Sequence, residues 1–144
     1  MEILIVIAIL AVLITFVVPN FVGARKRARD AVRKSDLSQI QKAMELYKSD
    51  QSPPSYPATG FFDSALCDTC WSSGGNCSGN IYMRKVPCDP VWTGSPYIYT
   101  LDPVDNSLYT LTACLENYGD IDQDATPVTE CTDLGRLSYT INEP

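Results

Sequence analysis

An uncharged, apolar run opens the chain. Between Ile3 and Ala24 no residue carries a charge, and Leu, Ile, Val and Ala dominate the first eighteen positions. As a helix this run would span roughly 33 Å, which matches a bilayer core of about 30 Å. It lacks the basic n-region, short apolar core and small-residue cleavage site of a signal peptide. The run therefore predicts a helix that lies in a membrane or among copies of the chain, and an ordinary single-span anchor is the plainer alternative.

A second helical segment follows directly, because the chain from Arg25 to Asp50 contains neither Pro nor Gly. Its apolar residues recur mostly three or four positions apart, which predicts one apolar stripe facing a globular domain. The stripe comprises Ala28, Val32, Leu37, Ile40, Met44 and Tyr47. Pro53 and Pro54 end the helix. Such a helix is roughly 70 Å long, so one half must project from a domain of this size.

The remaining residues predict a small sheet. Residues 51–80 hold Pro, Ser, Gly and Asn and predict a long loop. Residues 81–86 change in character, and aromatic and β-branched residues then form two strand-like runs, at 97–101 and 107–112, with 138–141 as a third candidate strand; three or four antiparallel strands are expected. The predicted fold is α+β: a helix over about residues 2–50 packs by its second half on a small antiparallel sheet, with loops stapled by disulfides. The predicted divisions are 1–24, 25–50 and 51–144.

Charge is distributed unevenly along the chain. Residues 1–50 carry eight Lys or Arg against five Asp or Glu, whereas residues 51–144 carry three against twelve. Six basic residues gather just after the apolar run: Arg25, Lys26, Arg27, Arg29, Arg33 and Lys34. The cluster has three interpretations: a solvated helix face, a membrane flank that later meets acidic neighbours, or a nucleic-acid contact. No specific nucleic-acid site is expected, because aromatic residues do not interleave with the cluster.

Histidine is absent from the chain. This excludes catalytic triads that use His and zinc sites of the His type. No nucleophile and base are suggested by the remaining residues, so we expect a protein that is not an enzyme.

All six cysteines lie beyond residue 66: Cys67, Cys70, Cys77, Cys88, Cys114 and Cys131. An even number placed after an apolar segment indicates disulfides in an oxidising compartment. A four-thiolate zinc site is the alternative for the first four, but the second pair lacks the close spacing of a zinc knuckle. A redox role for Cys67 and Cys70 has no βαβ context.

Two features of the apolar run point to a known family. Glu2 lies at its edge, where an unpaired carboxylate would be costly at membrane depth, and Pro19 interrupts the helical pattern and should loosen the helix. The segment Met1–Leu10, with Val17-Val18-Pro19-Asn20-Phe21, resembles the N-terminal helix of type IV pilins and type II secretion pseudopilins. A second segment, residues 83–97, resembles the Pro-Asp-Pro and Gly-x-Pro-Tyr region of pseudopilins and related pilins.

The resemblance implies how the N-terminus works. In that family the glutamate pairs with the terminal amine of a neighbouring subunit, so this role falls to Glu2, with Pro19 and Phe21 as further assembly residues. The first mature residue is usually N-methylated, and only Met1 precedes Glu2 here, so a leader and about three mature residues are expected to be missing. A prepilin peptidase and an assembly machinery are implied partners.

The C-terminal region also resembles pilins. Cys114 and Cys131 bracket an acidic loop, as the disulfide does in the C-terminal loop of pilins; pairing among the other four cysteines stays open. Asp120, Asp122 and Asp124 alternate in this loop, and some pseudopilins carry calcium here. The pattern of an EF-hand fails, so a calcium site and a solvated acidic loop are both open, and no other cofactor is expected.

The sequence thus favours a structural subunit of an extracellular, type IV pilus-like helical filament. It would be a homo-oligomer, assembled through the apolar helix, and a single-pass protein of the inner membrane beforehand. A pseudopilin of a type II secretion system is the alternative. A membrane-anchored extracellular binding module is the alternative of another class.

Overall fold

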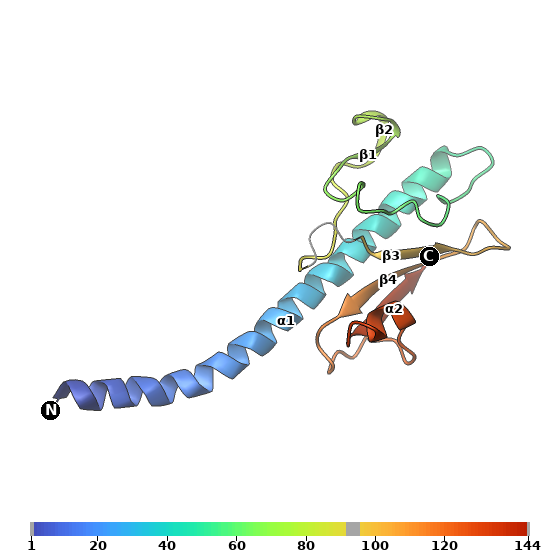
Figure 1. The fold of residues 1–144 in the computed structure, drawn as a ribbon. Coiled ribbons are helices and arrows are strands. Elements are labelled where there is room, and N and C mark those ends of the chain that lie inside the picture. Colours follow the sequence, from blue (N-terminus) through green and yellow to red (C-terminus); the bar gives the residue numbers. More distant parts are fainter. Residues whose placement is uncertain (1, 92–95, 144) are drawn as a thin grey trace.

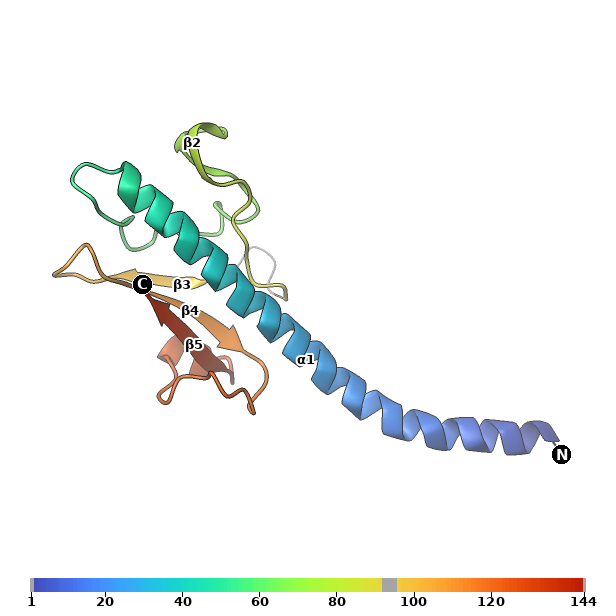
Figure 2. The same cartoon turned by 180° about the vertical axis from the view of Figure 1, so that it is seen from behind.

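The computed structural model describes residues 2–91 and 96–143, and the side chains of Glu2 and of residues 16–20 lie outside that description. The order of elements is one long helix, two strands, two further strands, a short helix and a last strand. Helix α1 spans Glu2–Asp50 and has 49 residues. The two ribbon views show its first half projecting beyond everything else, with a gentle curve (Figures 1 and 2).

Two antiparallel sheets make up the rest of the molecule, which we call the head. Strands β1 (Trp71–Gly74) and β2 (Ser78–Met83) form a hairpin. Strands β3 (Ile98–Leu101), β4 (Tyr109–Leu115) and β5 (Leu137–Asn142) form a three-stranded sheet with β4 in the centre. Helix α2 is a single turn, Thr129–Thr132. The predicted α+β fold is confirmed, although β1 and the first residues of β2 fall in the segment 51–80 that was predicted to be loop.

The second half of α1 packs on the head through its apolar side chains. Leu37 and Met44 are fully buried and Ile40 is 1% exposed. Facing them is a cluster of aromatic rings, in which Trp71 lies 5.3 Å from Tyr82 between ring centroids. Packing at these distances favours tilted and edge-to-face rings. The hairpin is also tied to the end of α1, because the hydroxyl of Tyr82 and the side-chain amide of Asn80 both donate to Asp50.

The predicted apolar stripe is wrong at its N-terminal end. Ala28 and Val32 are exposed, Val32 by 47%. Here the face of α1 that meets the head carries charged side chains instead. They are Asp30, Arg33 and Asp36, all buried. Their burial is compensated by ion pairs and hydrogen bonds to residues far along the chain, which a periodicity of apolar residues does not reveal.

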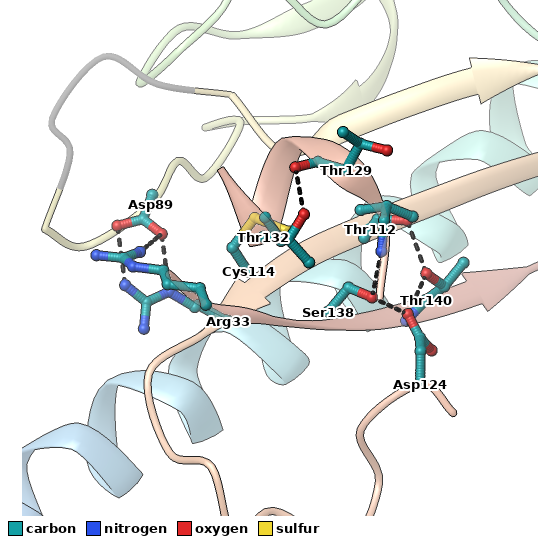
Figure 3. The surroundings of a disulfide bond; sticks show 12 residues. Arg33, Asp89, Thr112, Cys114, Asp124, Thr129, Thr132, Ser138 and Thr140 are labelled. Atoms are coloured by element: carbon teal, nitrogen blue, oxygen red, sulfur yellow. Dashed lines mark hydrogen bonds and ion pairs between the residues drawn. A yellow bond between two sulfur atoms is a disulfide. The ribbon is translucent and has the colours of Figure 1, made fainter. Parts of the chain in front are cut away.

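Three disulfides staple the head. They join Cys67 to Cys88, Cys70 to Cys77 and Cys114 to Cys131. The first two hold the loop before β1 and the β1–β2 hairpin, and the third ties β4 to α2 (Figure 3). A head of about 95 residues has only a modest core, so these cross-links contribute substantially to its stability.

Candidate filament interface

The projecting half of α1 exposes its apolar side chains. The exposed fractions of its large residues run from 78% at Ile3 to 51% at Leu10, with Ile14 at 58%. Burying one such side chain contributes roughly 1.5–3 kcal/mol, so a surface of this kind favours association. Lipid or another protein surface is needed to cover these exposed side chains.

Among the described residues, α1 included, no helix has the length and apolar character that crossing a lipid bilayer requires.

Of the three predicted assembly residues, Phe21 alone has a described side chain. It is 54% exposed, and the guanidinium of Arg25 lies 4.4 Å from the centre of its ring. The backbone of α1 is helical at Glu2 and at Pro19. The predicted roles of Glu2 in register and of Pro19 in loosening the helix depend on side chains outside the described residues.

The basic cluster is divided between two environments. Arg29, Arg33 and Lys34 bind carboxylates of the head. Within the described part of the chain, no ion pair is made by the three basic residues that precede them, at positions 25–27. The cluster is therefore not uniform: three of its residues bind the head, and the other three make no ion pair within the described residues.

Arg33 is at the centre of the fixing network. Its side chain is fully buried and lies 2.7 Å from Asp89, 2.7 Å from Asp30 and 2.8 Å from Glu116. Burial disfavours the charged guanidinium, but hydrogen bonds to the carboxylates outweigh it and raise the pKa of Arg33. Asp30 in turn accepts hydrogen bonds from the backbone N–H groups of Glu116 and Asn117. The network thus fixes α1 against the end of β4.

Glu116 receives two guanidinium groups. Arg29 donates to both of its carboxylate oxygens, and Arg33 lies against one of them. The hydrogen bonds from Arg29, with further contributions from Arg33, lower the pKa of Glu116 to about 2. Bidentate pairing of this kind sets the orientation of the partners as well as their distance. The direction in which the projecting half leaves the head is therefore set by these pairs.

A buried carboxyl completes the contact. The hydroxyl of Tyr97 donates to Asp36 at 2.6 Å. Burial raises the pKa of Asp36, although the hydrogen bond from Tyr97 opposes this. Burial also raises the pKa of Tyr97. Sequence reasoning missed Asp30, Asp36, Asp89 and Glu116; the available signal was charge at three-residue intervals along one face of α1, at positions 30, 33 and 36.

The three alternating aspartates of the C-terminal loop are engaged by protein groups. Lys34 donates to Asp120 at 2.5 Å and to Asp122 at 2.8 Å. Asp124 has different partners, because it accepts from the hydroxyls of Ser138 and Thr140 (Figure 3). Among residues 2–91 and 96–143, no three Cys, Asp or Glu side chains are grouped to hold a metal ion. The calcium interpretation of Asp120, Asp122 and Asp124 stays a prediction.

Comparisons with known proteins bear on the family to which the chain belongs. No family model matches the chain, and no solved structure matches it. The chain is 31% identical over 113 residues to type II secretion system core protein G of Escherichia coli (strain K12), covering 77% of this chain and 74% of that protein. It is 36% identical over 118 residues to the protein of the same name in Pseudomonas aeruginosa, covering 78% and 79%.

A pilus protein is similar as well. The chain is 44% identical over 117 residues to the type IV wide pilus major component PilA4 of Thermus thermophilus, covering 71% of this chain and 89% of that protein. The matches cover most of the length of each of these relatives. The structure that they match has one long helix with an exposed first half, and a small antiparallel head. The chain therefore belongs to the family of type IV pilins and type II secretion pseudopilins.

Proposed function

We propose that the chain is a structural subunit of an extracellular helical filament of the type IV pilus kind. The observation that carries the proposal is the projecting half of α1, whose large side chains between Ile3 and Ile14 are all at least half exposed. Bundling these helices at the centre of a filament would bury them, with the acidic heads outside. The pilus component and the secretion core proteins among the relatives support this arrangement.

The parts of the chain then have separate tasks. Residues 1–24 form the filament core, residues 25–50 connect the core to the head, and residues 51–144 form the head. Before assembly the first part lies in the inner membrane. A prepilin peptidase processes the N-terminus, which is then methylated, and an assembly machinery extracts the subunit.

Glu2, Pro19 and Phe21 guide assembly in this proposal. A carboxylate inside an apolar bundle is heavily penalised unless it is paired, so Glu2 selects the register in which it meets the amine of a neighbour. Proline removes one backbone donor, so Pro19 lets the helix adjust its packing. Phe21 adds an exposed ring where the core meets the connecting segment.

A pseudopilin of a type II secretion system is the second candidate. It is favoured by the two secretion core proteins, which match 77% and 78% of the chain. The pilus is favoured by the higher identity to the pilus component, 44%, and by a head with three disulfides. Cross-links of this number suit a subunit that persists outside the cell.

Electron microscopy of material sheared from cells that express the full chain tests the proposal. We expect filaments from the wild type and none from Glu2→Ala, with the head still folded. Asp68→Asn is the matched control, because Asp68 is 72% exposed, its ion pair among the described residues is with the 68% exposed Lys85, and asparagine tolerates the positive φ of this position. Long surface filaments indicate a pilus, whereas loss of protein secretion on deletion indicates a pseudopilus. A membrane-anchored monomer that forms no filaments and whose deletion leaves protein secretion unchanged would contradict both candidates. That result would favour a binding module.

A further inference from the structure

The segments that follow β4 and α2 carry three exposed large side chains, which we call the knob. The knob consists of Tyr118, Ile121 and Leu134, which are 64%, 95% and 48% exposed. The hydroxyl of Tyr118 donates to the carbonyl of Gly135, which brings the two parts of the knob together. The knob is anchored to α1 because Lys34 binds Asp120 and Asp122 on either side of Ile121. It is therefore held in place rather than carried on a free loop.

The rim of the knob is acidic. Glu130 and Asp133 are exposed and lie on or next to α2, immediately before Leu134. In the described part of the chain neither takes part in an ion pair. An exposed apolar centre with a charged rim is the usual form of a protein interface.

A complementary surface lies on the side of α1 that faces away from the head. We call it the back face; its residues are Phe21, Ala24, Ala28, Ala31 and Val32, all exposed. Spacings of three and four residues place them in one strip along the helix. Arg25 and Arg27 flank the strip, and neither has an ion pair within the described residues. The back face is thus apolar with a basic rim.

The back face continues the exposed apolar surface of the projecting half. The exposed large side chains described there lie between Ile3 and Ile14 and at Phe21 and Val22, and Val32 lies a further ten positions along the same helix. The predicted stripe assigned Ala28 and Val32 to the contact with the head, but that contact is made by Asp30, Arg33 and Asp36. The apolar residues at positions 28 and 32 therefore need another partner.

We infer that the knob of one subunit docks on the back face of a second copy of this chain. The proposal rests on the proposed filament and adds a specific contact to it. The two surfaces match in chemistry, since an apolar centre meets an apolar strip and an acidic rim meets a basic one. Both lie at the same level of α1, because the knob is bound to Lys34 and the back face ends at Val32. One subunit offers both surfaces on different sides, so the contact is heterologous and propagates into an open helical array.

Paired cysteine substitutions test the contact. All six native cysteines are in disulfides, so two introduced cysteines are the only free thiols. Filaments of Val32→Cys/Ile121→Cys are treated with a short bismaleimide and analysed on denaturing gels. Val32→Cys/Val104→Cys is the matched control, because Val104 is 93% exposed but lies in the β3–β4 connection, away from the knob. Each single cysteine variant is run alongside.

The proposal expects a ladder of covalent multimers from Val32→Cys/Ile121→Cys, at least about tenfold above the control, because apposed thiols have a high effective concentration. Neither single variant should give a ladder, since a heterologous contact joins two different positions. Filaments that form without this ladder overturn the docking but leave the filament intact. Labelling of Val32→Cys in assembled filaments by a thiol reagent confined to the lipid bilayer would also overturn the docking, because it would show that lipid covers the back face. Absence of wild-type filaments would instead overturn the proposed function, and the docking with it.

A charge exchange provides an independent measurement. Glu130→Lys/Asp133→Lys should reduce filament yield, and so should Arg25→Glu/Arg27→Glu, because each places like charges across the rim. Combining the four substitutions should restore at least part of the yield. A combined variant that is no better than either pair would contradict the contact.

Discussion

The guanidinium of Arg33 binds both oxygens of the Asp89 carboxylate, with Nε 2.7 Å from one and Nη2 3.0 Å from the other. The two residues are 56 positions apart, one on α1 and one in the segment before β3 (Figure 3). Both are buried. A fork-to-fork pair of this kind holds the segment to the helix and leaves little freedom in how they meet. The head and the second half of α1 are therefore held together, and the first half of α1 projects from them.

Removing Arg33 should destabilise the head strongly. Arg33→Met would leave Asp89, Asp30 and Glu116 without their shared cation, and breaking a buried pair in this way costs about 3–5 kcal/mol. Denaturant unfolding of the full chain in detergent, followed by tryptophan fluorescence, measures the change. Arg27→Met is the control and should stay within about 0.5 kcal/mol, because Arg27 is exposed. Equal losses from the two variants would show that the network contributes nothing specific.

Acid should loosen the contact between Glu116 and α1. The pKa of Glu116 is about 2 in the folded protein against an ordinary value of 4.5. A lowered pKa in the folded state contributes stability that is present above pH 4.5 and is lost as the pH falls toward 2. Asp120 acts in the same direction: burial raises its pKa, but the hydrogen bond from Lys34 and its other partners lower it overall. Asp36 has the opposite sign, since its raised pKa gives a contribution that is lost as the pH rises.

Unfolding free energies of the wild type and of Glu116→Gln between pH 2 and 4.5 measure this dependence. The variant should be less stable at neutral pH and its profile should be flatter over that range. Asp68→Asn is the control, because Asp68 is 72% exposed. A Glu116→Gln profile as steep as that of the wild type would assign the acid sensitivity to other carboxylates.

The disulfides should contribute in the order of the loops they close. Cys114 and Cys131 are 17 positions apart, and Cys70 and Cys77 are 7 apart. On the chain-entropy model the loop closed by Cys114 and Cys131 contributes about 3 kcal/mol and the one closed by Cys70 and Cys77 about 0.8 kcal/mol less. The loop closed by Cys67 and Cys88, which are 21 positions apart, should contribute at least as much as the first. Replacing each pair by Ser and measuring unfolding of the full chain without reductant tests the order. Cys131 is fully buried, so the polar replacement there adds to the loss; an Ala pair separates the two contributions.

Local patterns predicted most of the fold. The helix over about residues 2–50 and three of the strands follow from periodicity and from aromatic and β-branched runs. The β1 strand was missed because Trp71-Ser-Ser-Gly74 has no alternation, and its pairing and aromatic neighbours hold it in place. The predicted stripe was wrong at Ala28 and Val32 because sequence periodicity treats charged positions as outward. The partners that make Arg33 a buried residue, Asp89 and Glu116, come from distant parts of the chain.

The candidate site was predicted in part. The uncharged run that begins at Ile3 predicts from the sequence alone that the first half of α1 is apolar and needs a partner, and its side chains are exposed. The loop of Asp120, Asp122 and Asp124 has a partner that the sequence did not suggest, since the ammonium group of Lys34 binds the first two carboxylates. Since Lys34 lies 86 positions from Asp120, spacing alone does not reveal the pair.

Ile9 should be exposed in the isolated chain but buried in the filament, whereas Val104 should be exposed in both. Ile9 is 55% exposed and Val104 is 93% exposed, so in an isolated chain an aspartate at Ile9 should be no more harmful than one at Val104. If the projecting half is the filament core, the order reverses, because Ile9→Asp places an unpaired carboxylate in an apolar bundle, whereas Val104→Asp stays at the tip of the head. Filament yield, counted by electron microscopy and normalised to the folded chain, should therefore fall by about tenfold or more for Ile9→Asp and stay near the wild-type value for Val104→Asp. Equal yields would mean that the surface around Ile9 is not what joins the subunits.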